Sequence, residues 1–157
     1  KGKEGLFFAA ALGGFKKLFA ALQAASSPGA TGYQRLLEGY RAYYAFYREQ
    51  PGVFRMINEV GAVKSKAKTD TPGLKELLSF DNELFRWVAD NVAVGKADGS
   101  IREDLDPVMA TFSVIFMMTG FFNQLSLNGK TFLDHFSLDA EEFSDYSMRL
   151  LLGSIRR

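Results

Sequence analysis

The chain has 157 residues, of which 47% are hydrophobic, and its 19 basic and 18 acidic residues leave a formal net charge of +1. This length and composition suffice for one domain with its own core and exclude a disordered or fibrous chain. The balanced charge excludes a global attraction for nucleic acid, and the absence of cysteine excludes disulfides, thiolate metal sites and cysteine nucleophiles.

Apolar residues recur with the period of an α-helix along the chain, and no segment alternates as a β-strand would. The expected fold class is therefore all-α, a bundle of about six helices. The predicted helices cover residues 3–25, 31–50, 53–63, 72–96, 107–128 and 139–156.

Three of these helices have recognisable first residues. A side-chain oxygen at the cap position accepts a hydrogen bond from a free N–H of the first turn, and proline suits the first helical position. A glutamate three residues after the cap can complete a capping box. The predicted caps and their supporting residues are Thr71 with Pro72, Asp106 with Pro107, and Asp139 with Glu142.

Residues 108–129 carry no charge and are mostly apolar, so a membrane span has to be weighed against a core helix. Polar residues are spread along this segment, including Thr119 and Asn123. They favour a central helix of a folded domain, packed on every side, and no membrane partner is expected.

Three segments resemble, in chain order, parts of the TetR/AcrR family of transcriptional regulators. Gly2–Phe7 resembles the first residues of the helix that follows the family's helix-turn-helix. Gly99–Pro107 resembles the start of the family's eighth helix, and Arg149–Gly153 resembles the end of its last helix. The likeness extends over the whole chain in the order and length of the helices, but the family's first three helices have no counterpart.

The resemblance implies a ligand-responsive repressor, cytoplasmic and not an enzyme, of which this chain is the effector-binding and dimerisation part. Residues 1–25 would connect it to an N-terminal helix-turn-helix that is missing here, and residues 26–157 would bind ligand and dimerise. Operator DNA would be a partner only through the missing domain. The other partners would be a small hydrophobic effector and a second copy, joined through a four-helix bundle.

A set of mostly aromatic residues on the predicted inner faces suggests an effector pocket, because several buried tyrosine hydroxyls are easier to satisfy around a cavity. Asp81 lies in the middle of the apolar arc of its helix. It would recognise a cationic or hydrogen-bonding effector, or it would pair with an arginine such as Arg41 or Arg55 or cap a neighbouring helix. For each aromatic residue, simple core packing is the alternative. The predicted ligand-binding residues are Tyr40, Tyr43, Tyr47, Phe54, Asp81, Trp87, Asn91, Phe112, Phe116, Thr119 and Asn123.

Small residues interleave with apolar ones along one stripe of the last helix, which lets helices approach closely. Together with a face of the fifth helix, this stripe suits a dimer interface, with packing inside one chain as the alternative. The predicted interface residues are Val114, Met118, Phe121, Phe122, Leu125, Phe143, Tyr146, Ser147, Leu150 and Ser154.

No catalytic motif is visible. The single histidine, His135, lies in a predicted loop, and its neighbour Asp134 does not make a catalytic triad. One histidine without cysteine cannot build a zinc site, and no cofactor is expected. Two rival hypotheses stay open: a helical dimeric interaction module without ligand, and a helical-bundle enzyme without metal.

Overall fold

The computed structural model describes residues 2–157, and these form six α-helices and no β-strand. The predicted all-α fold class is therefore confirmed. The helices are α1 (Lys3–Ala24), α2 (Gly32–Glu49), α3 (Pro51–Lys64), α4 (Leu74–Asp98), α5 (Pro107–Phe136) and α6 (Ala140–Gly153).

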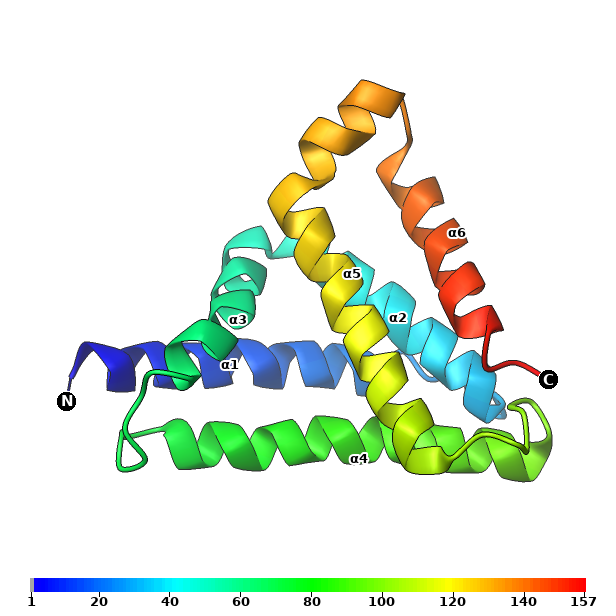
Figure 1. Cartoon of the computed structure of the whole chain (residues 1–157), viewed down its shortest axis with the longest axis horizontal. Coiled ribbons are helices and arrows are strands. Elements are labelled where there is room, and N and C mark those ends of the chain that lie inside the picture. The colour runs from blue at the N-terminus through cyan, green and yellow to red at the C-terminus, as the bar shows by residue number, and fades with distance from the viewer. Residues whose placement is uncertain (1) are drawn as a thin grey trace.

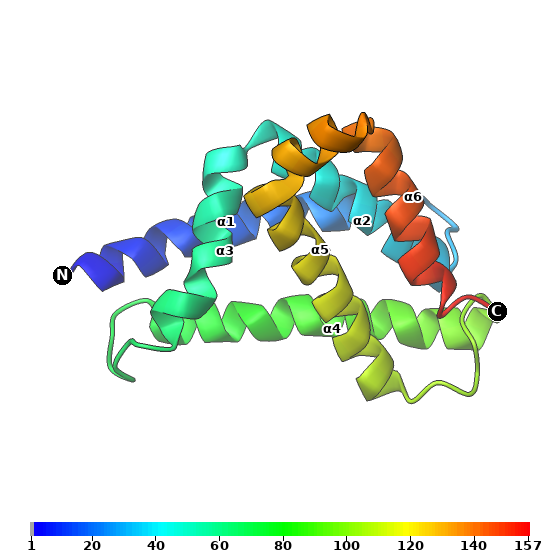
Figure 2. The ribbon, with the colours of Figure 1, turned by 45° about the horizontal axis from the view of Figure 1, so that its top comes forward.

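Helices α1 and α4 lie side by side along the longest dimension of the molecule, and α5 crosses α4 steeply (Figure 1). Helix α2 packs on both α1 and α4, and α3 packs on α1. From the crossing, α5 rises to an apex, where residues 137–139 turn the chain, and α6 then runs along α2. Figure 2 shows α3 and α6 on opposite sides of α5. Helices α1 to α5 thus surround a common interior, whereas α5 and α6 each keep one side outward.

Two of the three predicted caps are confirmed. The Asp106 carboxylate accepts a hydrogen bond from Met109 N at 2.8 Å, and the Asp139 carboxylate accepts one from Glu142 N at 2.8 Å. The predicted start of α4 is wrong, because Thr71 and Pro72 lie in a turn and the helix begins at Leu74. Gly73 stands before it with φ 83°, a left-handed conformation that glycine adopts without steric cost.

The predicted end of α5 near Asn128 is also wrong, because the helix continues to Phe136. Gly129 does not end the helix. This residue is buried, and a Cβ atom on it would crowd the Leu125 side chain. Further along, Leu133 is buried in the core, and this packing outweighs the weak helix propensity of glycine. Ser137, with φ 52°, terminates the helix.

The main core is an aromatic cluster around Phe122 of α5, whose side chain is fully buried. Its ring stacks on Tyr43 with centroids 4.7 Å apart and lies 5.0 Å from Tyr40. Phe54 of α3 completes the cluster at 6.2 Å. Such aromatic pairs add to the stabilisation from buried area, so this cluster anchors α2, α3 and α5 to one another.

Helix α5 is not packed on every side, contrary to prediction. Within residues 2–157, the two helices α1 and α5 are long and apolar enough to cross a membrane, by length and composition alone. In this fold α5 packs against α2, α3, α4 and α6. On its outer face, Met109 is 74% exposed and Phe116 is 72% exposed. The apolar residues of α5 therefore form two faces, one in the core and one on the outside of the molecule.

The first turn of α2 meets the last turns of α4 at very short range. A Cβ atom on Gly32 would overlap the backbone nitrogen of Gly95 and the carbonyl oxygen of Asn91. At the same place, Gly32 N donates a hydrogen bond to the Asp98 carboxylate at 2.8 Å. The two backbones touch only because glycine has no side chain, and the contact fixes the spacing of α2 and α4.

Candidate functional site

A cleft of about 280 Å³ lies where α1 to α5 come together. Every one of these five helices contributes to its wall. The lining residues are Phe15, Leu18, Tyr43, Ile57, Asn58, Leu84, Thr119, Gly120 and Asn123. The shape of the cleft therefore depends on the relative position of all five helices.

The α5 wall follows from helical spacing, because Thr119, Gly120 and Asn123 fall on one face of the helix. A Cβ atom on Gly120 would meet no other described atom within 4 Å, so the missing side chain leaves space in the cleft. The Thr119 hydroxyl donates a hydrogen bond to Ile115 O at 2.8 Å and thereby satisfies its own proton. Its oxygen remains able to accept a bond.

The wall of the cleft is electrically neutral. None of the described residues that line it is an aspartate, glutamate, lysine or arginine. Burial raises the pKa of the Tyr43 phenol far above its ordinary value, so this group stays protonated at neutral pH. The Nδ2 atom of Asn58 is buried without a hydrogen-bond partner in residues 2–157. Leaving such a donor unpaired costs about 1–3 kcal/mol.

The structure brings three of the predicted ligand-binding residues into the cleft: Tyr43, Thr119 and Asn123. Another three, Tyr40, Tyr47 and Phe54, pack around Phe122 in the aromatic cluster. They follow the alternative given for each aromatic residue, which was simple core packing. The aromatic stripe of α2 thus serves the core more than the cleft.

The remaining predicted residues of α4 have other partners. Asp81 forms an ion pair with Lys64 at 2.8 Å, so its partner is neither Arg41 nor Arg55. Asn91 is buried and donates a hydrogen bond to Trp87 O at 2.8 Å.

The ring of Trp87 fills the space above Gly39 of α2, which has no side chain. Phe112 and Phe116 do not face inward as predicted, because they are 47% and 72% exposed. Phe112 nevertheless packs on Phe85 of α4, with ring centroids 4.8 Å apart.

The prediction missed six lining residues: Phe15, Leu18, Ile57, Asn58, Leu84 and Gly120. Four of them are apolar and look like any core residue in the sequence. Asn58 did carry a signal, because it lies four residues after the buried Phe54 and directly after the buried Ile57. An amide in line with a buried face of a short helix is a candidate for a cavity wall.

A second groove, between α2 and α6, is crossed by charged side chains. Arg41 pairs with Asp145 at 3.1 Å and Arg48 pairs with Glu141 at 3.3 Å. These pairs are largely exposed, and such pairs contribute about 0–1 kcal/mol. Tyr40 also lines this groove, and its hydroxyl is buried without a partner in the described chain.

Replacing Tyr40 by phenylalanine should raise the free energy of unfolding by about 1 kcal/mol, because the change removes an unsatisfied buried hydroxyl. Urea denaturation of the two proteins would measure the difference. Tyr47→Phe is the matched control: its hydroxyl donates to Leu125 O at 3.4 Å, so its loss should destabilise slightly. A destabilised Tyr40→Phe protein would contradict the unpaired hydroxyl.

Exposed apolar side chains gather on α5, α6 and the turn between them. Of the twelve large hydrophobic residues with exposed side chains among residues 2–157, ten lie between Val108 and Leu150. We call them the outer α5–α6 surface: Val108, Met109, Phe112, Phe116, Leu127, Phe132, Phe136, Leu138, Tyr146 and Leu150. In monomeric proteins a concentration of exposed apolar side chains commonly marks an interaction site.

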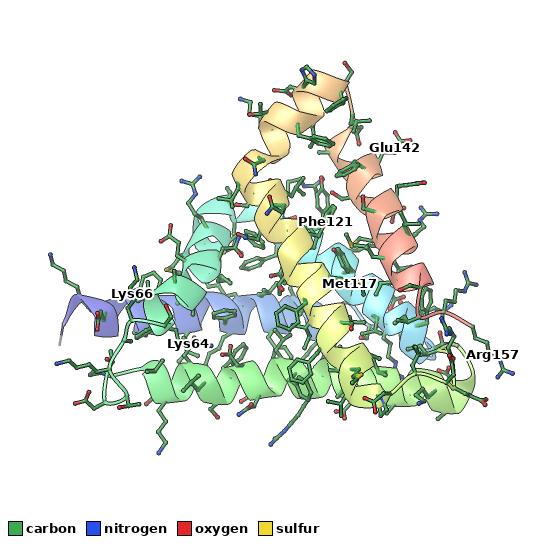
Figure 3. The ribbon with its side chains drawn as sticks, viewed as in Figure 1. Lys64, Lys66, Met117, Phe121, Glu142 and Arg157 are labelled. Atoms are coloured by element: carbon green, nitrogen blue, oxygen red, sulfur yellow. The ribbon has the colours of Figure 1, made fainter. Side chains whose placement is uncertain are left out.

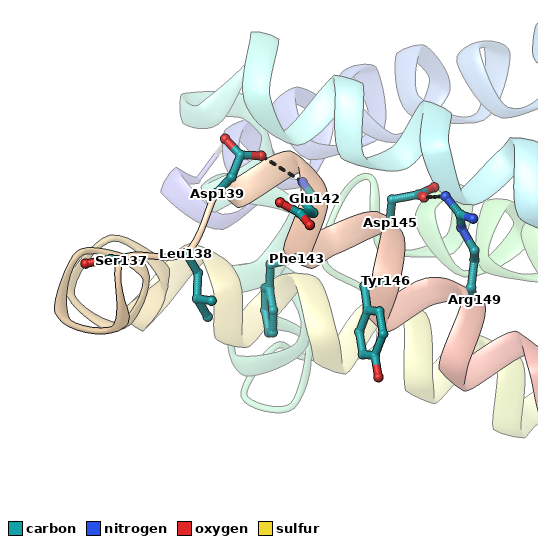
Figure 4. Close-up of a pocket in the computed structure, with 8 residues that line it drawn as sticks. All are labelled: Ser137, Leu138, Asp139, Glu142, Phe143, Asp145, Tyr146 and Arg149. Atoms are coloured by element: carbon teal, nitrogen blue, oxygen red, sulfur yellow. Dashed lines mark hydrogen bonds and ion pairs between the residues drawn. The ribbon is translucent and has the colours of Figure 1, made fainter.

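At the apex this surface borders a hollow of about 550 Å³. Figure 4 shows Leu138, Phe143 and Tyr146 pointing to the same side, away from the ion pair between Asp145 and Arg149. Helix α6 therefore turns a charged side toward α2 and an apolar side away from it.

The predicted dimer residues divide between the core and the exterior. On α5 the structure buries Val114, Met118, Phe122 and Leu125 in the chain's own core, so their predicted outward orientation is wrong. Phe121 of α5 (Figure 3) is half-buried. It packs on Phe143 of α6, with ring centroids 5.8 Å apart.

On α6, Tyr146 and Leu150 are 69% and 65% exposed, in agreement with an outward stripe. Ser154 is exposed as well, and Ser147 is half-buried. Three of the five predicted α6 residues are therefore exposed, and on α5 the exposed face is opposite to the predicted one.

No group of three or more histidine, cysteine, aspartate or glutamate side chains in the described part of the chain is arranged to hold a metal ion.

No protein-family model matches the chain, and no curated protein matches it. Among solved structures, the fold is similar to that of a bacterial regulatory protein in the tetR family from Rhodococcus RHA1. The TM-score is 0.74 at 17% sequence identity, and the alignment covers 99% of this chain and 75% of that chain. At this identity the likeness shows a shared fold.

Proposed function

We propose that this chain is the effector-binding and dimerising part of a transcriptional regulator, in which the cleft binds a small molecule and the outer α5–α6 surface joins two copies. The observation that carries the proposal is the concentration of exposed apolar side chains on α5 and α6. The shared fold with a tetR-family regulator supports it. In this proposal the chain has no catalytic role.

Dimerisation through α5 and α6 follows from the physics of the exposed surface. Leaving Met109, Phe116 and Leu150 in water is unfavourable, since each such side chain gains about 1.5–3 kcal/mol on burial. A two-fold symmetric interface buries the same residues twice. Two helices from each chain would then form a four-helix bundle.

Helix α5 links the dimer surface to the cleft. Thr119 and Asn123 line the cleft, and Phe116, which shares their face of the helix, belongs to the outer surface. An effector that fits one position of α5 better than another would shift the population of dimers toward it. This coupling distinguishes the proposal from a dimerisation module without ligand.

Helix α1 supplies the output. It contributes Phe15 and Leu18 to the cleft, so an effector would touch it directly. In the proposed regulator, α1 connects to a helix-turn-helix domain that binds operator DNA. Two recognition helices must match half-sites about one turn of DNA apart, so a small displacement of α1 changes operator affinity.

The dimer surface is tested by changing one exposed leucine to a charged residue. Leu150→Glu should weaken the dimer by on the order of a hundredfold or more, because two glutamates would be buried at a symmetric interface. Sedimentation analysis over a range of concentrations measures the dissociation constant, and circular dichroism checks that the helices remain.

Leu78→Glu on α4 is the matched control, because Leu78 is also exposed but lies outside the outer surface. This variant should dimerise like the unmodified protein. A monomer before any substitution, or equal weakening by both substitutions, would overturn the proposed interface.

A further inference from the structure

The size of the cleft limits its occupant. Its volume of about 280 Å³ lies at the small end of ligand pockets, which span about 300–1,000 Å³. Phe15, Leu18, Ile57 and Leu84 give it an apolar wall. A single aromatic ring with a short substituent matches this volume and this wall.

The charge of the occupant follows from the neutral wall. A charged ligand would lose part of its hydration in this cleft without finding an opposite charge among the lining residues, and such a transfer is unfavourable. Asp81, the carboxylate on the inner arc of α4, is already paired with Lys64. The cationic effector considered from the sequence therefore has no partner here.

The polar contact is defined by Asn58. Its Nδ2 atom is buried, lacks a partner in the described residues and belongs to a side chain that lines the cleft. A carboxamide nitrogen only donates hydrogen bonds. The group that satisfies it must therefore be an acceptor, and a carbonyl oxygen is the simplest uncharged one.

We infer that the cleft takes an uncharged, compact and mostly apolar molecule with a carbonyl oxygen, a ketone or ester, and that Asn58 holds this oxygen. The inference rests on the proposed function of the cleft as the effector site. It makes Asn58 the residue that determines specificity.

Four probes of similar size test the inference on the full chain: acetophenone, ethylbenzene, benzoate and benzylammonium. Titrations followed by ligand-observed NMR give their dissociation constants. Acetophenone should bind about tenfold more tightly than ethylbenzene, because only the ketone pairs with Asn58. Benzoate and benzylammonium should show no saturable binding.

Three variants assign this preference to the cleft. Asn58→Leu should bind ethylbenzene as before and bind acetophenone no better than ethylbenzene. Asn58→Asp should lose acetophenone and gain benzylammonium, because the donor becomes a carboxylate. Gly120→Phe should abolish binding of every probe, since its ring would enter the open space of the cleft.

The outcomes separate this inference from the proposed function. Equal affinity for acetophenone and ethylbenzene, or tighter binding of a charged probe, overturns the inference and leaves the cleft as an effector site. If no probe binds, or if Gly120→Phe does not affect binding, the inference and the effector role of the cleft both fail. Sedimentation judges dimerisation independently in either case.

Discussion

Replacing Gly32 by alanine is expected to cost about 3 kcal/mol or more of the free energy of unfolding, because its methyl group would overlap the backbone of α4. The clash involves the backbone nitrogen of Gly95 and the carbonyl of Asn91, which cannot turn aside as a flexible side chain does. The helices would have to separate, and the bond from Gly32 N to Asp98 would be lost. Urea denaturation followed by circular dichroism measures the change.

The control for this prediction is Gly120→Ala. Gly120 lies in the middle of α5, and an added Cβ there meets nothing within 4 Å among the described residues. Alanine has the higher helix propensity, so this variant should be more stable by about 0.5–1 kcal/mol. If both variants unfold alike, the close contact of α2 and α4 is not what the structure indicates.

The second large effect is expected at Phe122. Its ring is fully buried and lies within 6.2 Å, centroid to centroid, of Tyr43, Tyr40 and Phe54. Phe122→Ala would remove the centre of the aromatic cluster and leave a cavity among three helices. The expected cost is about 3–5 kcal/mol of the free energy of unfolding.

Phe116→Ala provides the comparison on the same helix, because this ring is 72% exposed. Within a monomer the change should alter stability by at most about 0.5 kcal/mol. Unfolding is followed at several protein concentrations, so that weaker dimerisation is distinguished from weaker folding. A small effect of Phe122→Ala, comparable to that of Phe116→Ala, would contradict the position of the cluster.

Local signals in the sequence predicted the helices well where the deciding interaction is itself local. Asp106 followed by Pro107 defines the start of α5 because the cap bond spans only three residues. The start of α4 was missed because Thr71 and Pro72 give the same signal, while Gly73 lets the chain turn once more before Leu74.

The orientation of α5 was not predictable in the same way. A helix that is apolar on all sides has no preferred face, so its sequence does not indicate which side enters the core. Phe116 and Phe122 are equally apolar, yet one is exposed and the other fully buried. The contacts with α2, α3, α4 and α6 decide which face is buried, and these contacts are properties of the whole fold.

The cleft was predicted only in part for a related reason. Tyr43, Thr119 and Asn123 were predicted because each places a polar group on an apolar helix face. Leu18 and Leu84 have no such mark, and their place in the wall depends on how α1 and α4 approach α5. A cavity is a space between elements, and its apolar lining is set by their packing.

The position of Trp87 has a practical consequence. It is the single tryptophan of the sequence, and its ring spans the junction of α2 and α4 above Gly39. Leu84, nearly one turn earlier on the same helix, forms part of the cleft wall. The intrinsic fluorescence of this single indole therefore reports on the junction of α2 and α4. A ligand-driven displacement of the two helices would be observed through it without an attached dye.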